Sequence, residues 1–273
     1  MVAPDRASRP IGMFDSGVGG LTVARAVIDL LPHEELVYLG DTARCPYGPR
    51  PADEVRRFAL EIMDHLVEEN VKLIVVACNS AASVALQAAR ARYEVPVLSV
   101  IEPGVTAAIA ATRNRRIGLI GTVATVGSGS YEDAVAATRA NVRLFSQACP
   151  RFVEFVERND MTSDEVVKTA EEYLQPLKDA EVDTLILGCT HYPLLSGVIR
   201  YVMGEDVVLV SSADATANEV FVKLKQDGLL NQAHEHGRHR FIASSREGMF
   251  SELGTLLLGP RFEGIEHRPW ELT

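Results

Sequence analysis

The chain repeats one strand-and-turn pattern. LIVVACNSAAS at residues 73–83 returns 111 positions later as TLILGCTHYPL at 184–194, and in each copy an apolar run ends on a cysteine. Apolar, β-branched runs of this length predict buried strands, so Cys78 and Cys189 are expected at the ends of equivalent strands. Two further pairs keep the same order: residues 95–100 with 206–211, and residues 11–20 with 117–126. A duplicated half-chain is the simplest explanation.

Apolar runs alternate with amphipathic stretches in both copies, as in successive β-α-β units. The predicted strands cover residues 10–14, 36–40, 72–77 and 95–100, then 116–121, 142–145, 183–188 and 207–210. The predicted helices cover residues 19–31, 53–69 and 81–92, then 104–113, 130–140 and 163–179. We therefore expect an α/β fold of two similar parallel-sheet domains, related by an internal pseudo-twofold duplication. Ligands of such sheets bind beyond the carboxyl ends of strands, which places an active site in the cleft between the domains.

The domain boundaries are placed at Glu102-Pro103-Gly104 and at its repeat counterpart, residues 211–214. The last segment, with a predicted helix at 214–227 and a strand at 240–243, is too short for a third domain and is assigned to the first. The expected domains are residues 8–101 plus 213–273, carrying Asp15 and Cys78, and residues 102–212, carrying Glu157, Cys189 and His191.

Composition narrows the class of protein. A hydrophobic share of 47% without low-complexity tracts indicates an ordinary globular chain, and no apolar stretch is long enough to span a membrane. The polar first ten residues lack the apolar core of a secretory signal, so a cytoplasmic protein is expected. The four cysteines form no C-x-x-C pair and are expected to be reduced thiols. A formal net charge of −10 disfavours nucleic acid as a partner.

The two strand-end cysteines suggest acid/base chemistry. A thiol where a helix begins lies near the positive end of the helix dipole, which is expected to lower its pKa from about 8.5. Each thiol also has a candidate partner, His191 for Cys189 and Asp15 for Cys78. Two thiols facing each other across a cleft could remove a proton from one face of a carbon and return one to the other. That is the requirement of a racemase or epimerase.

Six blocks of sequence closely resemble glutamate racemase. They are FDSGVGGLTV at 14–23, GDTARCPYG at 40–48, ACNSA at 77–81, IGLIGTVATV at 117–126, ACPRFVEFVE at 148–157 and LGCTHYPLL at 187–195. The resemblance extends over residues 11–227. It implies a cofactor-independent, two-base racemisation of L-glutamate and D-glutamate, a role in supplying D-glutamate for peptidoglycan biosynthesis, and a homodimer.

The resemblance also implies roles for individual residues. The implied catalytic residues are Cys78, which takes the proton of the D-enantiomer, Cys189, which takes that of the L-enantiomer, and the supporting Asp15, His191 and Glu157. The implied substrate-binding residues are Asp15, Ser16, Tyr47, Gly48, Asn79, Ser80, Thr190 and His191. The sequence departs from the family at Ser80, usually threonine, and at Glu154, often proline. The second departure leaves open whether Glu154 or Glu157 is the supporting acid.

Other functions remain open from the residues alone. An aspartate racemase, a hydrolase using Cys189 and His191, and a non-catalytic amino-acid-binding module are the alternatives. No cofactor is expected, because Lys72, Lys168 and Lys178 are not placed to form a Schiff base with pyridoxal phosphate. No metal is expected either, because Cys189 and His191 lack a second ligand pair. Of the remaining cysteines, Cys45 is interpreted as an ordinary loop residue and Cys149 as a core residue.

Overall fold

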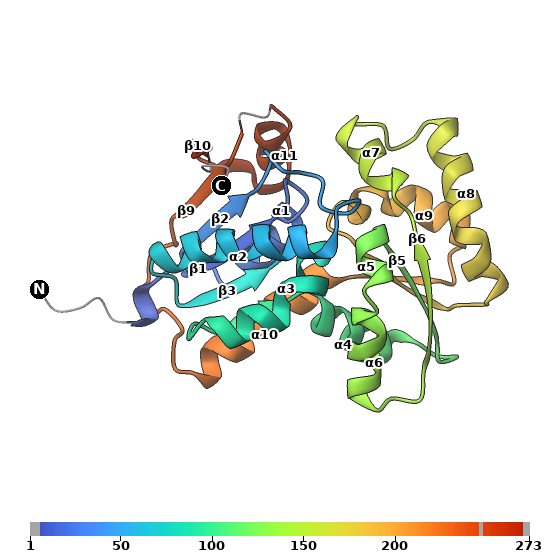
Figure 1. The fold of residues 1–273 in the computed structure, drawn as a ribbon, viewed down its shortest axis with the longest axis horizontal. Coiled ribbons are helices and arrows are strands. Elements are labelled where there is room, and N and C mark those ends of the chain that lie inside the picture. The colour runs from blue at the N-terminus through green and yellow to red at the C-terminus, as the bar shows by residue number, and fades with distance from the viewer. Residues whose placement is uncertain (1–5, 246–247, 270–273) are drawn as a thin grey trace, which may run out of the picture.

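The apolar runs of the two halves form two separate parallel sheets (Figure 1). The computed structural model describes residues 6–245 and 248–269. Sheet A has the order β10-β9-β2-β1-β3-β4, and its strands are β1 (Ile11–Asp15), β2 (Leu36–Gly40), β3 (Leu73–Val76), β4 (Val97–Ser99), β9 (His239–Ala243) and β10 (Glu266–His267). Sheet B has the order β6-β5-β7-β8, and its strands are β5 (Arg116–Gly121), β6 (Arg143–Ala148), β7 (Thr184–Gly188) and β8 (Val208–Ser211). The predicted fold class is confirmed.

The duplication is visible in the strand order. In sheet A, β1 lies between β2 and β3, with β4 next; in sheet B, β5 lies between β6 and β7, with β8 next. The cysteine-bearing strands β3 and β7 therefore have the same place in the two sheets. Both are buried along their whole length, as expected for strands covered on both faces. The edge strand β6 is only partly buried.

Helices cover both faces of each sheet. They are α1 (Leu21–Leu30), α2 (Ala52–Glu68), α3 (Asn79–Arg92), α4 (Ile101–Ala111), α5 (Val123–Gly127), α6 (Ser130–Thr138), α7 (Arg151–Glu157), α8 (Asp164–Asp179), α9 (Ser196–Met203), α10 (Ser212–Gln226) and α11 (Gly248–Leu258). Short 3-10 turns occur at η1 (Arg6–Ser8), η2 (Tyr192–Leu195) and η3 (Gly259–Arg261). None of the helices in the described part of the chain is both long and apolar enough to cross a membrane.

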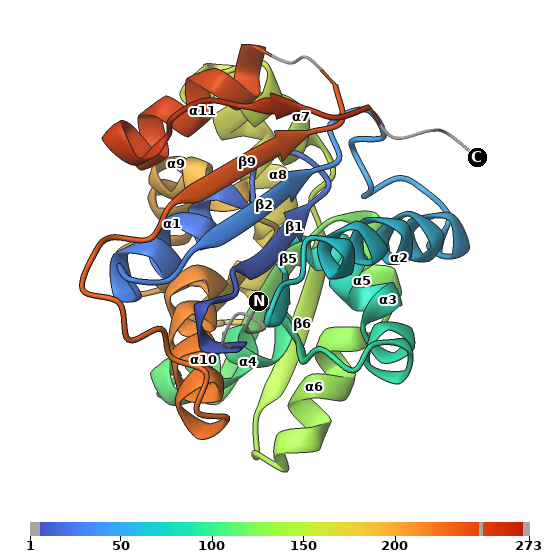
Figure 2. The same cartoon turned by 90° about the vertical axis from the view of Figure 1, so that its left-hand side faces the viewer.

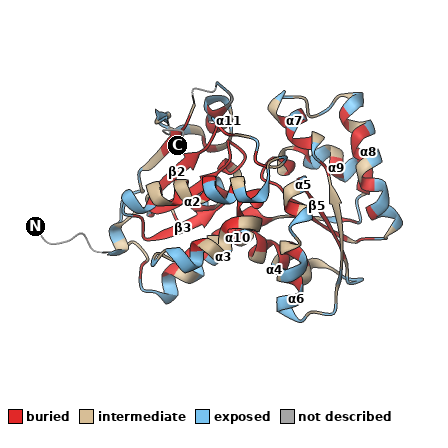
Figure 3. Cartoon of the chain, in the orientation of Figure 1, coloured by how far each residue is buried: buried red, intermediate tan, exposed pale blue. Residues whose placement is uncertain are grey.

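Alternate residues of each strand face different cores. On β1, Phe14 belongs to a core with α2 and α3, whereas Met13 belongs to a core with α1, α10 and α11. The Phe14 core continues without interruption into sheet B, where Ile117 and Ile186 pack with α4 and α6. The far face of sheet B has its own core beneath α7, α8 and α9. Figure 3 marks the buried residues in red on the strands and helices of both halves.

The predicted boundary at Glu102-Pro103-Gly104 lies within a helix, since these residues fall in the first turn of α4. Proline is tolerated there, since the first N–H groups of a helix need no partner within it. The helix α4 packs against α6, β7 and α10, and α10 packs in turn against α1. The division at residues 101 and 212 stays a prediction, and residues 246–247 and 270–273 of the assigned first domain lie outside the described residues.

The strand β9 extends sheet A by pairing in parallel with β2, and β10 pairs with β9 (Figure 2). Arg240 on β9 fixes this edge, because its guanidinium lies 2.6 Å from a Glu69 carboxylate oxygen and 2.7 Å from one of Glu266.

Candidate active site

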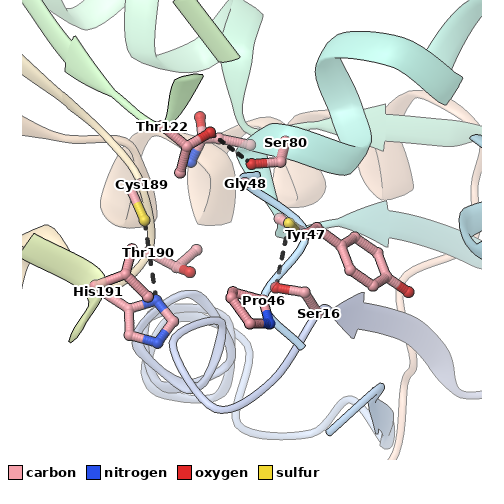
Figure 4. A pocket seen from close by; sticks show the side chains of 12 residues that line it. Ser16, Pro46, Tyr47, Gly48, Ser80, Thr122, Cys189, Thr190 and His191 are labelled. Atoms are coloured by element: carbon pink, nitrogen blue, oxygen red, sulfur yellow. Dashed lines mark hydrogen bonds between the residues drawn. The ribbon is translucent and has the colours of Figure 1, made fainter. Parts of the chain in front are cut away.

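The carboxyl ends of strands from both sheets meet around a small cavity of about 20 Å³, room for one water molecule. Its lining residues are Ser16, Pro46, Tyr47, Gly48, Cys78, Asn79, Ser80, Thr122, Val153, Cys189, Thr190 and His191. Figure 4 shows Cys189 and His191 on one side of this space and Ser16 and Pro46 on another. The structure thus brings together the sequence-predicted binding residues except Asp15, which lies buried beside the cavity.

Cys78 approaches from sheet A. It follows β3 and occupies the position just before the first turn of α3, and its Sγ lies 3.6 Å from Ser16 Oγ. Asp15 ends the neighbouring strand β1 and is fully buried. Its carboxylate accepts hydrogen bonds from the Gly17 N–H at 3.0 Å and from Thr190 Oγ1 at 3.2 Å. Both groups therefore lie where β1 and β3 end side by side.

Cys189 approaches from sheet B, directly after β7. Its Sγ lies 3.9 Å from His191 Nδ1, and His191 Nε2 lies 3.8 Å from Glu157 Oε1 at the end of α7. Nε2 is buried and has no hydrogen-bond partner among the described residues. Glu154, the other candidate acid, is exposed on α7, so Glu157 is the glutamate that lies next to His191.

Hydrogen bonds join the two halves around the cavity. Besides the bond from Thr190 to Asp15, Ser80 Oγ lies 2.8 Å from Thr122 Oγ1, and Tyr131 Oη donates to Asn79 Oδ1 at 2.7 Å. Asn79 Nδ2 is buried, and no described residue forms a hydrogen bond with it. These contacts hold the cleft closed while leaving the Asn79 amide N–H free to bind a ligand.

The loop after β2 supplies one wall. Tyr47 Oη donates to Asp41, so the Tyr47 ring points away from the cavity (Figure 4), which Pro46 and Gly48 also line. Asp41 also accepts hydrogen bonds from Arg44 Nε at 2.6 Å and from Ser244 Oγ at 3.0 Å. Asp41 therefore supports the wall without lining the cavity.

The thiols are harder to ionise than the sequence suggested. Burial, followed by the negative charge of Asp15, raises the pKa of Cys78 to about 12. Burial also raises the pKa of Cys189 well above its ordinary range, and a Cys78 thiolate would raise it further. The expectation that helix N-termini lower these pKa values is wrong for this closed cleft, because the loss of hydration outweighs the helix dipole. Burial likewise raises the pKa of Asp15, while the charge of His191 opposes the shift.

Other chemistry has little support in the described residues. Within residues 6–245 and 248–269, no three His, Cys, Asp or Glu side chains cluster closely enough to hold a metal ion. The Lys72 amine is buried 2.5 Å from the Glu34 carboxylate and donates to the Leu229 carbonyl at 2.9 Å. The expectation of no metal and no cofactor stays an expectation.

Comparison with known proteins identifies the family. A family profile described as Asp/Glu/hydantoin racemase matches residues 21–220. The chain belongs to this family. A glutamate racemase from Parafrankia sp. is 54% identical over 261 residues, covering 95% of this chain and 94% of that protein. The resemblance to glutamate racemase is confirmed, and so is the enzyme class, a racemase and hence an isomerase.

Solved structures of the family share the whole fold. A Bacillus anthracis glutamate racemase isoform superposes with a TM-score of 0.90 at 41% identity, covering 96% of this chain and 97% of that one. A Francisella tularensis glutamate racemase in complex with D-glutamate gives 0.89 at 31% identity, covering 96% and 98%.

Sequence reasoning missed some residues of the site. Cys45 is not an isolated loop residue, because its thiol lies 3.6 Å from Glu157 Oε1; Cys149, in contrast, is a buried core residue as predicted. Tyr131 carried no signal in the sequence. Thr122 did, because it follows the predicted strand at 116–121, as Ser16 follows the first predicted strand, and strand ends of this kind are expected at the cleft.

Proposed function

We propose that the chain catalyses cofactor-independent racemisation of L-glutamate and D-glutamate, with Cys78 and Cys189 as the two acid/base groups. The observation that carries the proposal is that thiols from the equivalent strands β3 and β7 line one cavity. Glutamate as substrate is supported by the relatives, which are named glutamate racemases, one of them solved with D-glutamate.

The reaction needs one thiolate and one thiol. Starting from L-glutamate, the Cys189 thiolate takes the Cα proton, and the Cα–H electron pair spreads into the α-carboxylate. The Cys78 S–H then delivers its proton to the opposite face of Cα, giving D-glutamate and a Cys78 thiolate. The reverse reaction uses the same groups in exchanged roles, so the proton states must be reset before the next turnover in the same direction.

Electrostatics favour this division of roles. A charge on Cys78 raises the pKa of Cys189, because two thiolates in one water-poor cavity repel each other. Ionising one thiol therefore keeps the other protonated. The ammonium group of the substrate brings a positive charge that partly offsets the burial that disfavours the first thiolate.

Supporting roles follow from the contacts. We assign Asp15 to the Cys78 side, and His191 with Glu157 to the Cys189 side, because His191 lies 3.9 Å from that thiol and 3.8 Å from Glu157. A buried Asp15 with a raised pKa can hold a proton or a charge near Cys78 as the reaction requires. Asp15 also belongs to the substrate-binding set through its position beneath the cavity.

The remaining polar groups are assigned to substrate binding. Asn79 Nδ2 has no hydrogen-bond partner within residues 6–245 and 248–269. This N–H group and the main-chain N–H groups beside it can bind the α-carboxylate and stabilise the charge that develops there. The assigned binding residues are Ser16, Tyr47, Gly48, Asn79, Ser80, Thr190 and His191, with Tyr47 acting through its main chain.

Three further assignments rest on the resemblance to the family. We propose that the product D-glutamate supplies peptidoglycan biosynthesis, that the enzyme acts in the cytoplasm, and that it works as a homodimer. A cell-wall defect relieved by external D-glutamate on depletion of the protein would support the first of these.

The test is circular dichroism of L-glutamate and, separately, D-glutamate incubated with the purified protein after chelator treatment, in D₂O. We expect both signals to decay to zero with deuterium entering Cα. Cys78→Ala and Cys189→Ala should each reduce the rate by at least about a thousandfold, while Cys149→Ala, which removes a thiol outside the cavity, should retain activity. Substantial activity in either of the first two variants would refute the two-base scheme.

Three further results would each point to one of the rival functions. Decay with L-aspartate and none with glutamate would move the chain to aspartate racemisation. A burst of acyl-enzyme at Cys189 with ester substrates would indicate the hydrolase. Tight binding of glutamate without deuterium exchange would indicate the binding module.

A further inference from the structure

Cys45 lies where the two sides of the cleft meet. It belongs to the loop that follows β2 of sheet A, yet its thiol donates to Glu157 Oε1 at 3.6 Å, on α7 of the sheet B half. Its Sγ also packs against Gly17, where an added Cβ atom would lie 3.1 Å from it. Gly17 in turn donates its N–H to Asp15. One small side chain thus contacts both flanks of the site.

Beyond Glu157, further contacts lead to the thiol of Cys189. Glu157 Oε1 lies 3.8 Å from His191 Nε2, and His191 Nδ1 lies 3.9 Å from Cys189 Sγ. The Nε2 atom is buried and faces Glu157, and it lacks a hydrogen-bond partner in the part of the chain that the structure describes. We call these four residues, Cys45, Glu157, His191 and Cys189, the thiol-to-thiol array.

Glu157 is the member of the array that most needs support. It is the last residue of the short helix α7, and its side chain is 32% exposed. Fixing a long, partly exposed side chain costs rotamer entropy, so a carboxylate without a donor would spend much of its time turned toward solvent. Burial and then the charge of Glu157 raise the pKa of Cys45, which keeps its S–H protonated as a donor.

We propose that Cys45 is a positioning residue that holds Glu157 against His191 and so promotes proton transfer at Cys189 more than at Cys78. The inference rests on the proposed function. The Cys189 side of the site is then complete only while the loop after β2 contacts α7, because the donor Cys45 and the Glu157 carboxylate come from different halves of the molecule.

The test measures which proton transfer limits the rate. Enantiomers have equal free energy, so kcat/KM must be equal in the two directions for every variant, and activity alone cannot identify the affected step. The primary isotope effect on kcat/KM can. Cα-deuterated L-glutamate reports removal of the proton by Cys189, and Cα-deuterated D-glutamate reports removal by Cys78.

Cys45→Ala removes the donor, and we expect kcat/KM to fall about three- to tenfold, the range for losing one hydrogen bond. The isotope effect should rise with deuterated L-glutamate and fall with deuterated D-glutamate, since the Cys189 step becomes more limiting. Cys45→Ser keeps a hydrogen-bond donor, so both isotope effects should equal those of the wild type. Cys149→Ala, a buried thiol outside the array, should leave both unchanged.

Unchanged isotope effects in Cys45→Ala, or a rise with deuterated D-glutamate instead, would overturn the inference. So would a Cys45→Ser variant with the isotope effects of Cys45→Ala. If Cys45→Ala does not fold, as judged by far-ultraviolet circular dichroism, Cys45→Val tests the same loss of a donor with the volume filled. A wild-type chain that does not racemise glutamate refutes the proposed function itself, and the inference with it.

Discussion

The Cys78 thiol is surrounded by groups that act on its ionisation in opposite directions. Burial and the charge of Asp15 favour the neutral thiol, whereas hydrogen bonds from Ser16 and from the main chain at Ala81 favour the thiolate. Burial is the largest effect, and the pKa rises from an ordinary 9.0 to about 12. Because the folded chain holds this proton more tightly than the unfolded one, its stability is fully present below pH 9.0 and falls as the pH rises toward 12.

This shift predicts how the free enzyme reacts with iodoacetamide. Only the thiolate is alkylated, so the rate at Cys78 should increase about tenfold per pH unit from pH 8 to pH 11 without levelling. In the urea-unfolded chain it should level off near the ordinary thiol pKa. Peptide mass spectrometry after timed quenching measures both rates. A plateau near pH 9 in the folded protein would contradict the burial argument.

At the scale of residues, sequence reasoning found the groups that lie at strand ends. Cys78, Asp15, Cys189 and His191 could be predicted because each follows an apolar run, and the ends of parallel strands meet at one edge. The contact of Cys45 with Glu157 could not be predicted, because it joins positions 112 residues apart through a loop and a short helix. The predicted lowering of the thiol pKa values was also wrong, because burial depends on how tightly the cleft closes.

The loop of residues 41–48 is shaped by a strand that is far away in sequence. Ser244, after β9, donates to Asp41 Oδ1 at 3.0 Å and accepts the Ala43 N–H at 2.8 Å. Its main-chain N–H also donates to the Gly40 carbonyl at 3.1 Å. The end of β9 thus fixes the start of the loop that carries Cys45, Tyr47 and Gly48.

Ser244→Ala should therefore affect the site through this loop. It removes a hydrogen-bond partner of the buried Asp41 carboxylate and of the Ala43 N–H, which costs about 1–3 kcal/mol, and we expect a lower Tm together with a severalfold increase in KM for glutamate. Thermal unfolding and steady-state kinetics measure the two effects. Ser251→Ala, at an exposed position on α11, serves as the control. A Tm and a KM equal to those of the wild type would show that the loop does not depend on Ser244.

At the scale of elements, the β-α-β alternation predicted most strands and helices, and the domain boundary at Glu102-Pro103-Gly104 stays a prediction. Proline and glycine suggest a turn, yet both occupy the first turn of α4, where proline costs little and tertiary packing against α10 and β7 sustains the helix. The sequence pattern cannot report such packing.

The cavity of about 20 Å³ has direct consequences for the whole molecule. A space that holds one water molecule is smaller than an amino acid, so we expect the cleft to widen when glutamate binds. The bonds Thr190–Asp15, Ser80–Thr122 and Tyr131–Asn79 join the halves in the closed state. They contribute to the stability of the closed form but not to that of an open one.

Tyr131→Phe tests this arrangement. The fully buried Tyr131 hydroxyl donates to Asn79 Oδ1 at 2.7 Å, and its loss leaves a buried acceptor unpaired at about 1–3 kcal/mol. We expect KM for glutamate to rise roughly fivefold or more, because 1 kcal/mol is about a fivefold change in an equilibrium constant. Tyr201→Phe, at a side chain that is 75% exposed, should behave as the wild type. Equal KM values in the two variants would show that this bond does not hold the closed state.

The two sheets could be predicted from the repeat, but the core they share could not. Phe14 of sheet A and Ile186 of sheet B belong to one continuous set of buried side chains, through α3, α4 and α6. Each helix pattern shows an apolar face without showing which neighbour covers it. The relative placement of the halves, and with it the shape of the cleft, therefore depends on contacts that no local pattern encodes.

The pairing of β9 with β2 also determines when the protein can become active during its synthesis. The strands of sheet B all lie within residues 116–211, whereas sheet A joins Leu36–Gly40 to His239–Ala243. As the chain leaves the ribosome, sheet B can therefore be completed first, and β2 keeps an unpaired edge until β9 has been made. The loop with Cys45, Tyr47 and Gly48 is anchored only when Ser244 arrives. Both thiols are translated long before the wall between them is in place, so a nascent chain ending before β9 carries both cysteines and no finished active site.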